Sequence, residues 1–403
     1  MKKIFLFTHS YPFSKVSEAF IEIELQIASK LDVEITIIPL YSSSYQKEVP
    51  PGIKIYTGLS CLSKFRKALI FYKLLINPLL YSLFIQNKSI YKKWINWYYA
   101  IKYLYGALLI KDFLLSNKLI FQEGSILYSF WLNYTVLGFA LAKEKSLNLM
   151  TCKFYSRAHR YDLYAEEVGI FIPYREKMIA CLNKIFSCSN DGVQFLSERY
   201  PNFSSKIELD RLGVIPVNSV NKIQKTEDIS LISCSNVISV KRVCLIFNSI
   251  KQFCEDNPSL KVTWLHIGDG SEMTLLKELV LTDTPYNLTA NLAGYMIHSE
   301  IVELLEGNEF DAFINLSLSE GLPVTLMEAI SAGVPLIATD TGGSKEIVTR
   351  ETGCLLPLSF SQEDFAKAVM YCTNNKNLRE SSLSFFHSNF SAVKNYENFY
   401  QKL

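Results

Sequence analysis

The sequence predicts an α/β protein made of two successive domains, each built on a parallel sheet. The chain has 403 residues, and at about 150 residues per domain two or three domains are expected. Apolar residues make up 49% of the sequence, which is typical of a protein with buried cores. Short apolar runs alternate with helical patterns in two sets, separated by a polar stretch at 217–228. This alternation favours parallel sheets covered by helices.

The first set of elements begins at the N-terminus. An apolar run at 4–8 is too short for the apolar region of a signal peptide, so we interpret it as a buried strand. A polar loop at 9–17, a helical pattern at 18–31 and a second apolar run at 33–40 follow. Together they form a βαβ unit, which implies parallel strands. Further elements of this set are expected at 125–131, 134–143 and 185–188.

The second set follows the polar stretch at 217–228, which we interpret as a linker. Its strands are expected at 229–233, 260–267, 312–315 and 334–338. We therefore predict an N-terminal domain at 1–217 and a C-terminal domain at 218–385. Residues 386–403 have the pattern of amphipathic helices.

Residues 49–111 contain no Asp or Glu but ten basic residues, together with many aromatic ones. The best candidate for a membrane span, 68–85, contains Lys73, Asn77 and Pro78, whereas a spanning helix needs about 20 mostly apolar residues. We expect basic aromatic helices at about 59–111 that lie on an anionic membrane surface. The alternative is ordinary helices that pack on the sheet with solvated lysines.

Composition excludes several classes of protein. The 41 Lys and Arg nearly balance the 39 Asp and Glu, so a general nucleic-acid coat is not expected. The nine cysteines contain no C-x-x-C pair, which excludes a zinc ribbon and a dithiol redox motif. We expect most of them to be reduced and buried, in a cytosolic protein. No D-x-D is present, and no metal site is expected.

The most informative stretch is 317–335, SLSEGLPVTLMEAISAGVP. Apolar residues precede it, as at the end of a strand. Gly321 suits a loop, and Pro323 suits the first turn of a helix, where no N–H bond is lost. Gly333 is placed to end that helix. The stretch therefore predicts a strand, a tight loop, a short helix, a turn and another strand.

Two carboxylates occupy distinct places in this stretch. Glu320 lies where the carboxyl end of a strand meets a helix N-terminus, which is where open α/β sheets bind ligands. Glu328 lies inside the helix, away from its apolar stripe. The free N–H groups at the helix N-terminus suit a phosphate. The alternative is that both glutamates are solvated surface residues.

Glu320 and Glu328 with seven residues between them, followed by 333–347 with its Gly342-Gly343 pair, resemble the E-x7-E signature of retaining glycosyltransferases of family 4. The segments at 17–21, 157–162, 233–243, 266–270 and 294–296 resemble further motifs of that family. The resemblance implies the GT-B fold, in which two Rossmann-like domains face a central cleft and the C-terminal helix, here 386–403, crosses back to the N-terminal domain.

The resemblance also implies roles for individual residues. Glu328 would hold the donor ribose, and Glu320 would lie near the donor sugar. Lys241 and Arg242 would bind the donor diphosphate, and His159 would lie near the reacting sugar as a catalytic residue with Glu320. The remaining donor contacts that it implies are Gly268, Gly294, Tyr295, Gly321, Leu322 and Val324.

Two departures from the family pattern bear on these roles. Many members have a Gly-Arg pair where this chain has Cys234-Ser235, so diphosphate binding is expected to rest more on Lys241. Many members also have a Gly-Gly loop after the first strand, where this chain has HSYPFSK at 9–15. No contact to donor or acceptor is therefore carried over to this loop.

The implied reaction moves a sugar from a nucleotide-sugar donor to an acceptor hydroxyl with retention at the anomeric carbon, without metal or cofactor. A UDP-sugar is the favoured donor and a GDP-sugar the alternative. The expected acceptor is a lipid-linked saccharide in polysaccharide or O-antigen assembly, at the cytosolic face of a membrane. Two other functions stay open: a nucleotide-sugar 2-epimerase of the same fold, and a nucleotide-sugar-binding protein without catalysis.

Overall fold

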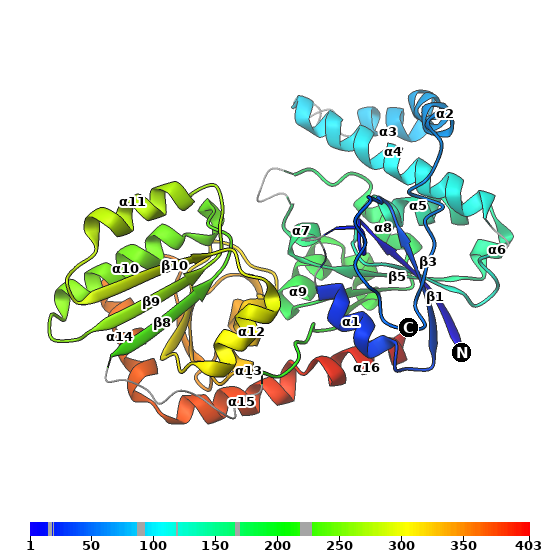
Figure 1. The fold of residues 1–403 in the computed structure, drawn as a ribbon. Coiled ribbons are helices and arrows are strands. Elements are labelled where there is room, and N and C mark those ends of the chain that lie inside the picture. The colour runs from blue at the N-terminus through cyan, green and yellow to red at the C-terminus, as the bar shows by residue number, and fades with distance from the viewer. Residues whose placement is uncertain (15–17, 19, 87–92, 118–119, 166–169, 218–227) are drawn as a thin grey trace. The chain divides into compact units, whose positions relative to one another are not determined.

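The computed structural model describes residues 1–14, 18, 20–86, 93–117, 120–165, 170–217 and 228–403 (Figure 1). The chain divides into two compact units. The first unit comprises Met1–Asp210 with Tyr396–Leu403, and the second comprises Arg211–Asn395. The division falls before the predicted linker, of which only the end residues, 217 and 228, are described.

The first unit contains a sheet that has seven strands within the described residues, in the order β3-β2-β1-β4-β5-β6-β7. Its strands are β1 Lys2–Thr8, β2 Val33–Pro39, β3 Lys54–Ile55, β4 Ile126–Ser129, β5 Lys153–Ala158, β6 Lys184–Ser187 and β7 Ile207–Leu209. All the pairings are parallel. Its helices are α1 Phe20–Ala28, α2 Lys64–Leu75, α3 Pro78–Gln86, α4 Trp94–Ser116, α5 Tyr134–Lys143, α6 Leu147–Met150, α7 Arg160–Leu163, α8 Arg175–Cys181 and α9 Asn190–Arg199.

The position of strand β1 in the sheet explains why its sequence is an almost unbroken apolar run. Successive side chains of a strand point to opposite faces of the sheet. Phe5 and Phe7 join the core beneath α4 and α5, whereas Ile4 and Leu6 join the core beneath α1. Because helices cover both faces, both sets of side chains are buried.

The described residues of the acid-free segment, 49–111, form β3, the helices α2 and α3, and most of α4, which continues past Asp112 to Ser116. Helices α2 and α3 lie beside α4 (Figure 1). The apolar run at 68–85 is divided near Asn77, since α2 ends at Leu75 and α3 begins at Pro78. Within the described part of the chain, no helix is long and apolar enough to cross a membrane.

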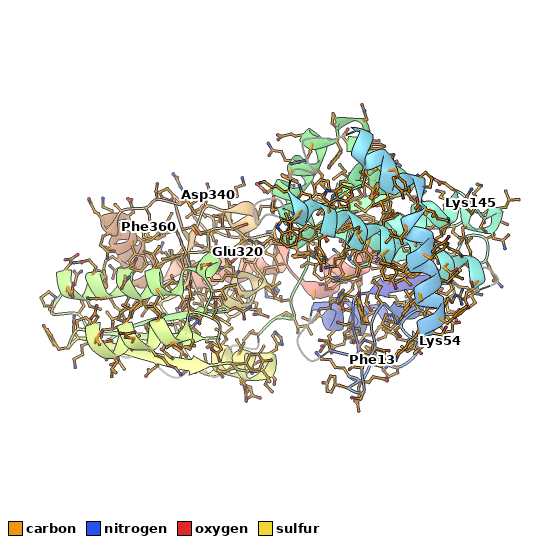
Figure 2. The ribbon with its side chains drawn as sticks, turned by 90° about the horizontal axis from the view of Figure 1, so that it is seen from above. Phe13, Lys54, Lys145, Glu320, Asp340 and Phe360 are labelled. Atoms are coloured by element: carbon orange, nitrogen blue, oxygen red, sulfur yellow. The ribbon has the colours of Figure 1, made fainter. Side chains whose placement is uncertain are left out.

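The second unit contains a parallel sheet whose described strands have the order β10-β9-β8-β11-β12-β13. Its strands are β8 Ile229–Cys234, β9 Val262–Ile267, β10 Leu288–Gly294, β11 Ala312–Asn315, β12 Leu336–Thr339 and β13 Gly353–Leu356. Its helices are α10 Val243–Asp256, α11 Met273–Asp283, α12 His298–Gly307, α13 Val324–Ser331, α14 Gln362–Asn374 and α15 Asn377–Asn389. Figure 2 shows the side chains that fill this unit and the first.

The chain ends on the first unit, as the resemblance implies. Helix α16, Ala392–Lys402, follows α15, and Tyr396–Leu403 belong to the first unit. Phe399 and Tyr400 join the core that contains Ile4 and Leu6. The guanidinium of the buried Arg157 lies 3.9 Å from the centre of the Phe399 ring. The last helix is therefore part of the core of the first unit.

Candidate functional site

The stretch around Glu320 forms the predicted strand, loop, helix, turn and strand. Helix α13 begins after Pro323 and ends where Gly333 takes a φ of +70°. The Val334 N–H donates to the Ala329 carbonyl, which closes the helix end. Both glutamates are buried, Glu320 at 5% exposure and Glu328 at 7%. The interpretation that they are solvated surface residues is therefore wrong.

Glu320 is held by two polar partners in the second unit. The Lys241 ammonium lies 2.5 Å from Glu320 Oε1, and the Asn315 amide nitrogen donates to the same oxygen at 3.1 Å. Asn315 is itself fixed, because its amide oxygen accepts from the Ser317 hydroxyl and N–H. In this ion pair the Glu320 side chain is buried, whereas the Lys241 side chain is partly exposed. The Lys241 ammonium therefore still reaches the surface of the site.

Glu328 has a partner that the sequence did not suggest. The His298 Nε2 lies 2.7 Å from Glu328 Oε1, and His298 is the first residue of α12. The Cys234 thiol, at the end of β8, lies close to both parts of the site. The pKa of Cys234 is raised to about 12, mainly by burial and also by the negative charge of Glu328, while the positive charge of Lys241 opposes both effects. Cys234 therefore remains a neutral thiol beside the two charged groups.

Arg242 directly precedes α10 and has a left-handed backbone conformation, with φ of +51°. Its Nε donates to the Leu316 carbonyl at 2.6 Å and its Nη1 to the Leu358 carbonyl at 3.3 Å. Within the described residues, its buried Nη2 has no hydrogen-bond partner. The side chain therefore connects the start of α10 to the loop that carries Glu320. Its Nη2 group remains available as a hydrogen-bond donor.

Two glycines lie together at the carboxyl ends of β9 and β10. The Gly268 N–H donates to the Gly294 carbonyl at 2.8 Å. Gly268 has φ of +142°, and a Cβ there would lie 1.9 Å from the Ser235 carbonyl oxygen. Gly294 has φ of +72° and open space where a Cβ would be, and the next residue, Tyr295, is exposed. Both positions therefore favour glycine, and the space beside the Gly294 Cα is open.

The remaining predicted contacts lie in the loop before α13 and at its start. The Gly321 carbonyl accepts from the Gly343 N–H at 2.7 Å. Leu322 is buried, and Val324 is the first residue of α13. A Cβ on Gly342 would lie 1.9 Å from the Glu320 carbonyl oxygen. The Gly-Gly pair therefore allows the loop of Glu320 to pack closely against 342–346.

His159 lies in the first unit, after β5, and its ring contacts the rings of Phe130 and Trp131 at centroid distances of 4.8 and 4.9 Å. Its Nδ1 is 3.3 Å from the Cys188 sulfur. Burial lowers the pKa of His159 to about 3, and the positive charge of Arg157 acts in the same direction. The imidazole is therefore neutral at physiological pH and suited to hydrogen bonding.

Glu18 organises the loop after β1, and sequence reasoning missed it. Its carboxylate accepts hydrogen bonds from the His9, Ser10 and Tyr11 N–H groups at 2.8, 2.9 and 2.8 Å. It also accepts from the Trp131 indole N–H at 2.6 Å. One buried carboxylate thus satisfies three successive backbone donors and fixes a ring that contacts His159. Its position at the start of the first helix was visible in the sequence, but its partners were not.

The described residues contain no group of three or more His, Cys, Asp or Glu placed to hold a metal ion.

Comparison with known proteins identifies the second unit. Residues 218–382 match the family described as glycosyl transferases group 1. The second unit carries a glycosyl transferases group 1 domain. This domain contains the Lys241–Glu320 pair, Glu328 and the Gly268–Gly294 corner. His159 and Glu18 lie outside the matched residues.

Curated relatives match in part of their length. The GtfA subunit of UDP-N-acetylglucosamine–peptide N-acetylglucosaminyltransferase from Streptococcus agalactiae is 30% identical over 150 residues, which are 36% of this chain and 28% of that protein. An Escherichia coli UDP-Gal:alpha-D-GlcNAc-diphosphoundecaprenol alpha-1,3-galactosyltransferase is 30% identical over 127 residues, 31% of this chain and 32% of that protein. The matches thus span about a third or less of these relatives.

The whole chain resembles solved structures. Anabaena HepE, solved in complex with UDP and glucose, matches with a TM-score of 0.66 and 12% identity, over 100% of this chain and 99% of that chain. At this level of identity the match speaks for the fold alone. The chain has the GT-B fold, with two Rossmann-like α/β units.

Proposed function

We propose that this protein is a retaining glycosyltransferase of family 4, which moves a sugar from a nucleotide-sugar donor to an acceptor hydroxyl without metal or cofactor. The group 1 domain and the activities for which two relatives are named support glycosyl transfer. Both relatives are named for UDP-sugar donors, and HepE was solved with UDP, so we favour a UDP-sugar.

The observation that carries the proposal is the arrangement of charge around the loop before α13. Lys241 supplies a partly exposed cation for the donor diphosphate, and Arg242 Nη2 adds a donor. Such fixed positive groups stabilise the leaving nucleoside diphosphate. Glu320 lies beside Lys241, where a carboxylate can stabilise positive charge that develops on the sugar. Glu328, eight positions further on, accepts the ribose hydroxyls in place of His298.

The other predicted residues complete this proposal. Gly268, Gly294 and Tyr295 would receive the base, and Gly321, Leu322 and Val324 would line the sugar and phosphate. His159 would donate a hydrogen bond to the sugar as a neutral imidazole.

For the acceptor we propose a lipid-linked saccharide in cell-surface polysaccharide assembly, at the cytosolic face of an anionic membrane. The Escherichia coli relative is named for an acceptor on diphosphoundecaprenol. The helices α2–α4 of this chain expose aromatic side chains within a segment that has no acidic residue. No nucleic-acid partner is proposed.

Thermal stabilisation by UDP, GDP, ADP and CMP tests the donor site. We expect one nucleotide family at 100 times its dissociation constant to stabilise the protein by about 2.7 kcal/mol. Glu328→Ala should abolish this effect, because the ribose loses its acceptor. Glu303→Ala, an exposed glutamate on α12, is the matched control and should keep it. Stabilisation by no nucleotide, in a folded protein, would contradict the donor site.

Product analysis then tests the chemistry. With donor and acceptor present, we expect a glycoside with the anomeric configuration of the donor, and equal turnover with and without EDTA. Release of nucleoside diphosphate without acceptor, together with an epimerised sugar, would indicate a 2-epimerase instead. Donor binding without turnover for any acceptor would indicate a binding protein.

A further inference from the structure

The carboxylate of Glu328 on α13 has its hydrogen-bond partner on another helix, α12. The His298 Nε2 lies 2.7 Å from Glu328 Oε1. A carboxylate only accepts hydrogen bonds, so the proton of this bond is on His298 Nε2. Among the described residues, no second side chain or backbone N–H donates to this carboxylate. Within that part of the chain, Glu328 therefore relies on one imidazole.

Glu320, the other glutamate of the site, is held differently. Its Oε1 accepts from the Lys241 ammonium and also from the Asn315 amide. A ligand that takes over one of these donors leaves the other in place. A ligand that displaces His298 must instead bring its own donor, because a buried carboxylate without a hydrogen bond is costly. The two hydroxyls of a ribose are such donors.

The two partners of the His298–Glu328 contact differ in their freedom to move. The side chain of His298 is 58% exposed, whereas that of Glu328 is 9% exposed. Glu328 belongs to α13, in which residues 326–331 are all buried. His298 is the first residue of α12, and the preceding Ile297 is exposed. Rotation of the His298 side chain therefore moves the imidazole into solvent without disturbing a core, while Glu328 stays in place.

We propose that His298 is an internal competitor of the nucleotide-sugar donor: it occupies Glu328 until the ribose hydroxyls replace it, and it returns when the nucleotide leaves. This inference deepens the proposed function and rests on its donor site. Because donor binding must first break the hydrogen bond between His298 and Glu328, the contact lowers the apparent affinity for the nucleotide. It also favours release of the nucleoside diphosphate that remains after sugar transfer.

Calorimetric titration with UDP tests the competition, and GDP takes its place if the thermal panel selects it. We expect His298→Ala to bind the nucleotide at least about fivefold more tightly than wild type, since a hydrogen bond to a charged group no longer has to be broken. A substitution that only disturbed the fold would weaken binding instead. His298→Gln, whose amide can donate from nearly the position of Nε2, should bind as wild type does.

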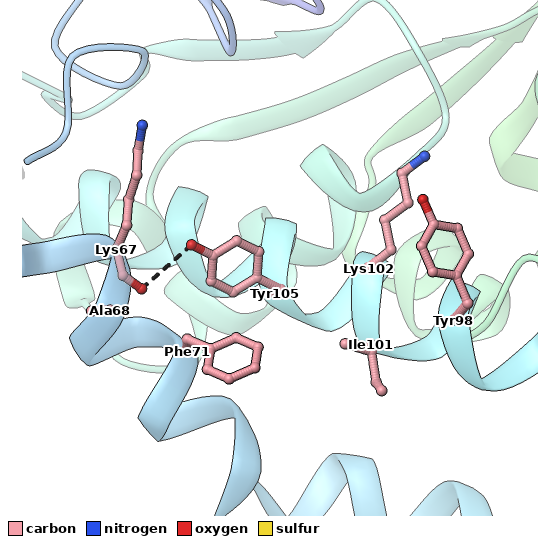
Figure 3. Close-up of a pocket in the computed structure, with 7 residues that line it drawn as sticks. All are labelled: Lys67, Ala68, Phe71, Tyr98, Ile101, Lys102 and Tyr105. Atoms are coloured by element: carbon pink, nitrogen blue, oxygen red, sulfur yellow. Dashed lines mark hydrogen bonds between the residues drawn. The ribbon is translucent and has the colours of Figure 1, made fainter. Parts of the chain in front are cut away.

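Two variants and one ligand serve as controls. Ser299→Ala changes the next exposed residue of α12 and should leave the affinity unchanged. Lys67→Ala removes a positive charge in the first unit but keeps the Lys67 carbonyl, which accepts from the Tyr105 hydroxyl at 3.3 Å (Figure 3). The 2′,3′-dideoxy form of the nucleotide has no hydroxyl for Glu328, so it should bind wild type and His298→Ala equally.

Nuclear magnetic resonance of the imidazoles shows the exchange directly. The resonances of His298 are those missing from the spectrum of His298→Gln. We expect them to shift when the nucleotide binds, because the imidazole leaves Glu328. Those of His387, which is exposed on α15 of the same unit, should stay in place.

Three outcomes would overturn the competition. They are unchanged or weaker nucleotide binding by His298→Ala, an equal gain for the dideoxy nucleotide, and His298 resonances that stay in place while the nucleotide binds. If Glu328→Ala abolishes binding and His298→Ala leaves it unchanged, the donor site stands and the competition alone is rejected. If neither wild type nor His298→Ala binds any nucleotide of the panel, both proposals are rejected.

Discussion

His159 is a residue whose protonation is decided by its surroundings. Burial and the charge of Arg157 lower its pKa from 6.5 to about 3. Between these two values the unfolded chain binds a proton that the folded chain does not. The free energy of unfolding therefore falls as the pH falls through this window.

We expect His159→Asn to flatten this dependence. Between about pH 7 and pH 4.5, wild type should lose about 2 kcal/mol more stability than the variant, because one pKa unit corresponds to about 1.4 kcal/mol. Urea unfolding at both pH values measures the difference. The raised pKa of the buried Asp162 acts in the opposite direction, but Asp162 is present in both proteins. Parallel pH curves for the two proteins would show that His159 titrates normally.

At the scale of an element, the loop after β1 is shaped by one carboxylate. Glu18 accepts three backbone N–H groups and the Trp131 indole N–H. Each oxygen of the Glu18 carboxylate accepts two N–H groups. A glutamine at this position would place an NH₂ group where one of these oxygens lies, and at least the two hydrogen bonds to that oxygen would be lost. Hydrogen bonds to a charged group contribute about 1.5–3 kcal/mol each.

Glu18→Gln should therefore destabilise the protein by about 2–3 kcal/mol and change the emission of Trp131. Urea unfolding and tryptophan fluorescence measure the two effects. Glu22→Gln is the matched control, since Glu22 pairs with Lys47 at the surface and should cost less than about 1 kcal/mol. Equal stability of the two variants would contradict the role of Glu18.

At the scale of the whole molecule, the C-terminal helix α16 contributes side chains to the core of the first unit, which begins at the N-terminus. Phe399 is fully buried and packs on the rings of Tyr128 and Phe186 at centroid distances of 5.3 and 5.2 Å. It also covers Arg157, whose guanidinium nitrogens contact Asp210 at 3.2 Å and Glu24 at 3.5 Å. The buried ion pairs of Arg157 with Asp210 and Glu24 are therefore covered by α16, the last helix of the chain.

Phe399→Ala should destabilise the first unit by about 3–5 kcal/mol, the usual cost of removing a buried phenylalanine. Denaturant unfolding followed by the tryptophans of that unit measures it. Val393→Ala on the same helix is the control, because Val393 is half exposed and should cost little. A loss below 1 kcal/mol for Phe399→Ala would indicate that α16 contributes little to this core.

Elements with a strong local pattern were predicted closely. The helix at Tyr134–Lys143 and the strand at Ala312–Asn315 have the predicted bounds. Strands β3 and β7 were missed because two or three residues carry too little pattern. Strand β13 was also missed, since only Leu355 and Leu356 of its four residues are large and apolar. Strand β10 was missed because Leu288 is its only buried residue and it has few large apolar side chains. Strand β5 was not recognised as a strand, since its sequence includes the charged Arg157.

The sequence by itself determined the alternation of strands and helices, the stretch of 317–335 and the family that it resembles. Only the tertiary structure decided which side chains meet. Lys241 and Glu320 are 79 residues apart and Glu18 and Trp131 are 113 apart, yet each pair shares a hydrogen bond. The physical reason is that periodicity reports which face of an element is buried. Contacts between distant segments follow instead from the order of the strands, which brings their carboxyl ends to one edge of a sheet.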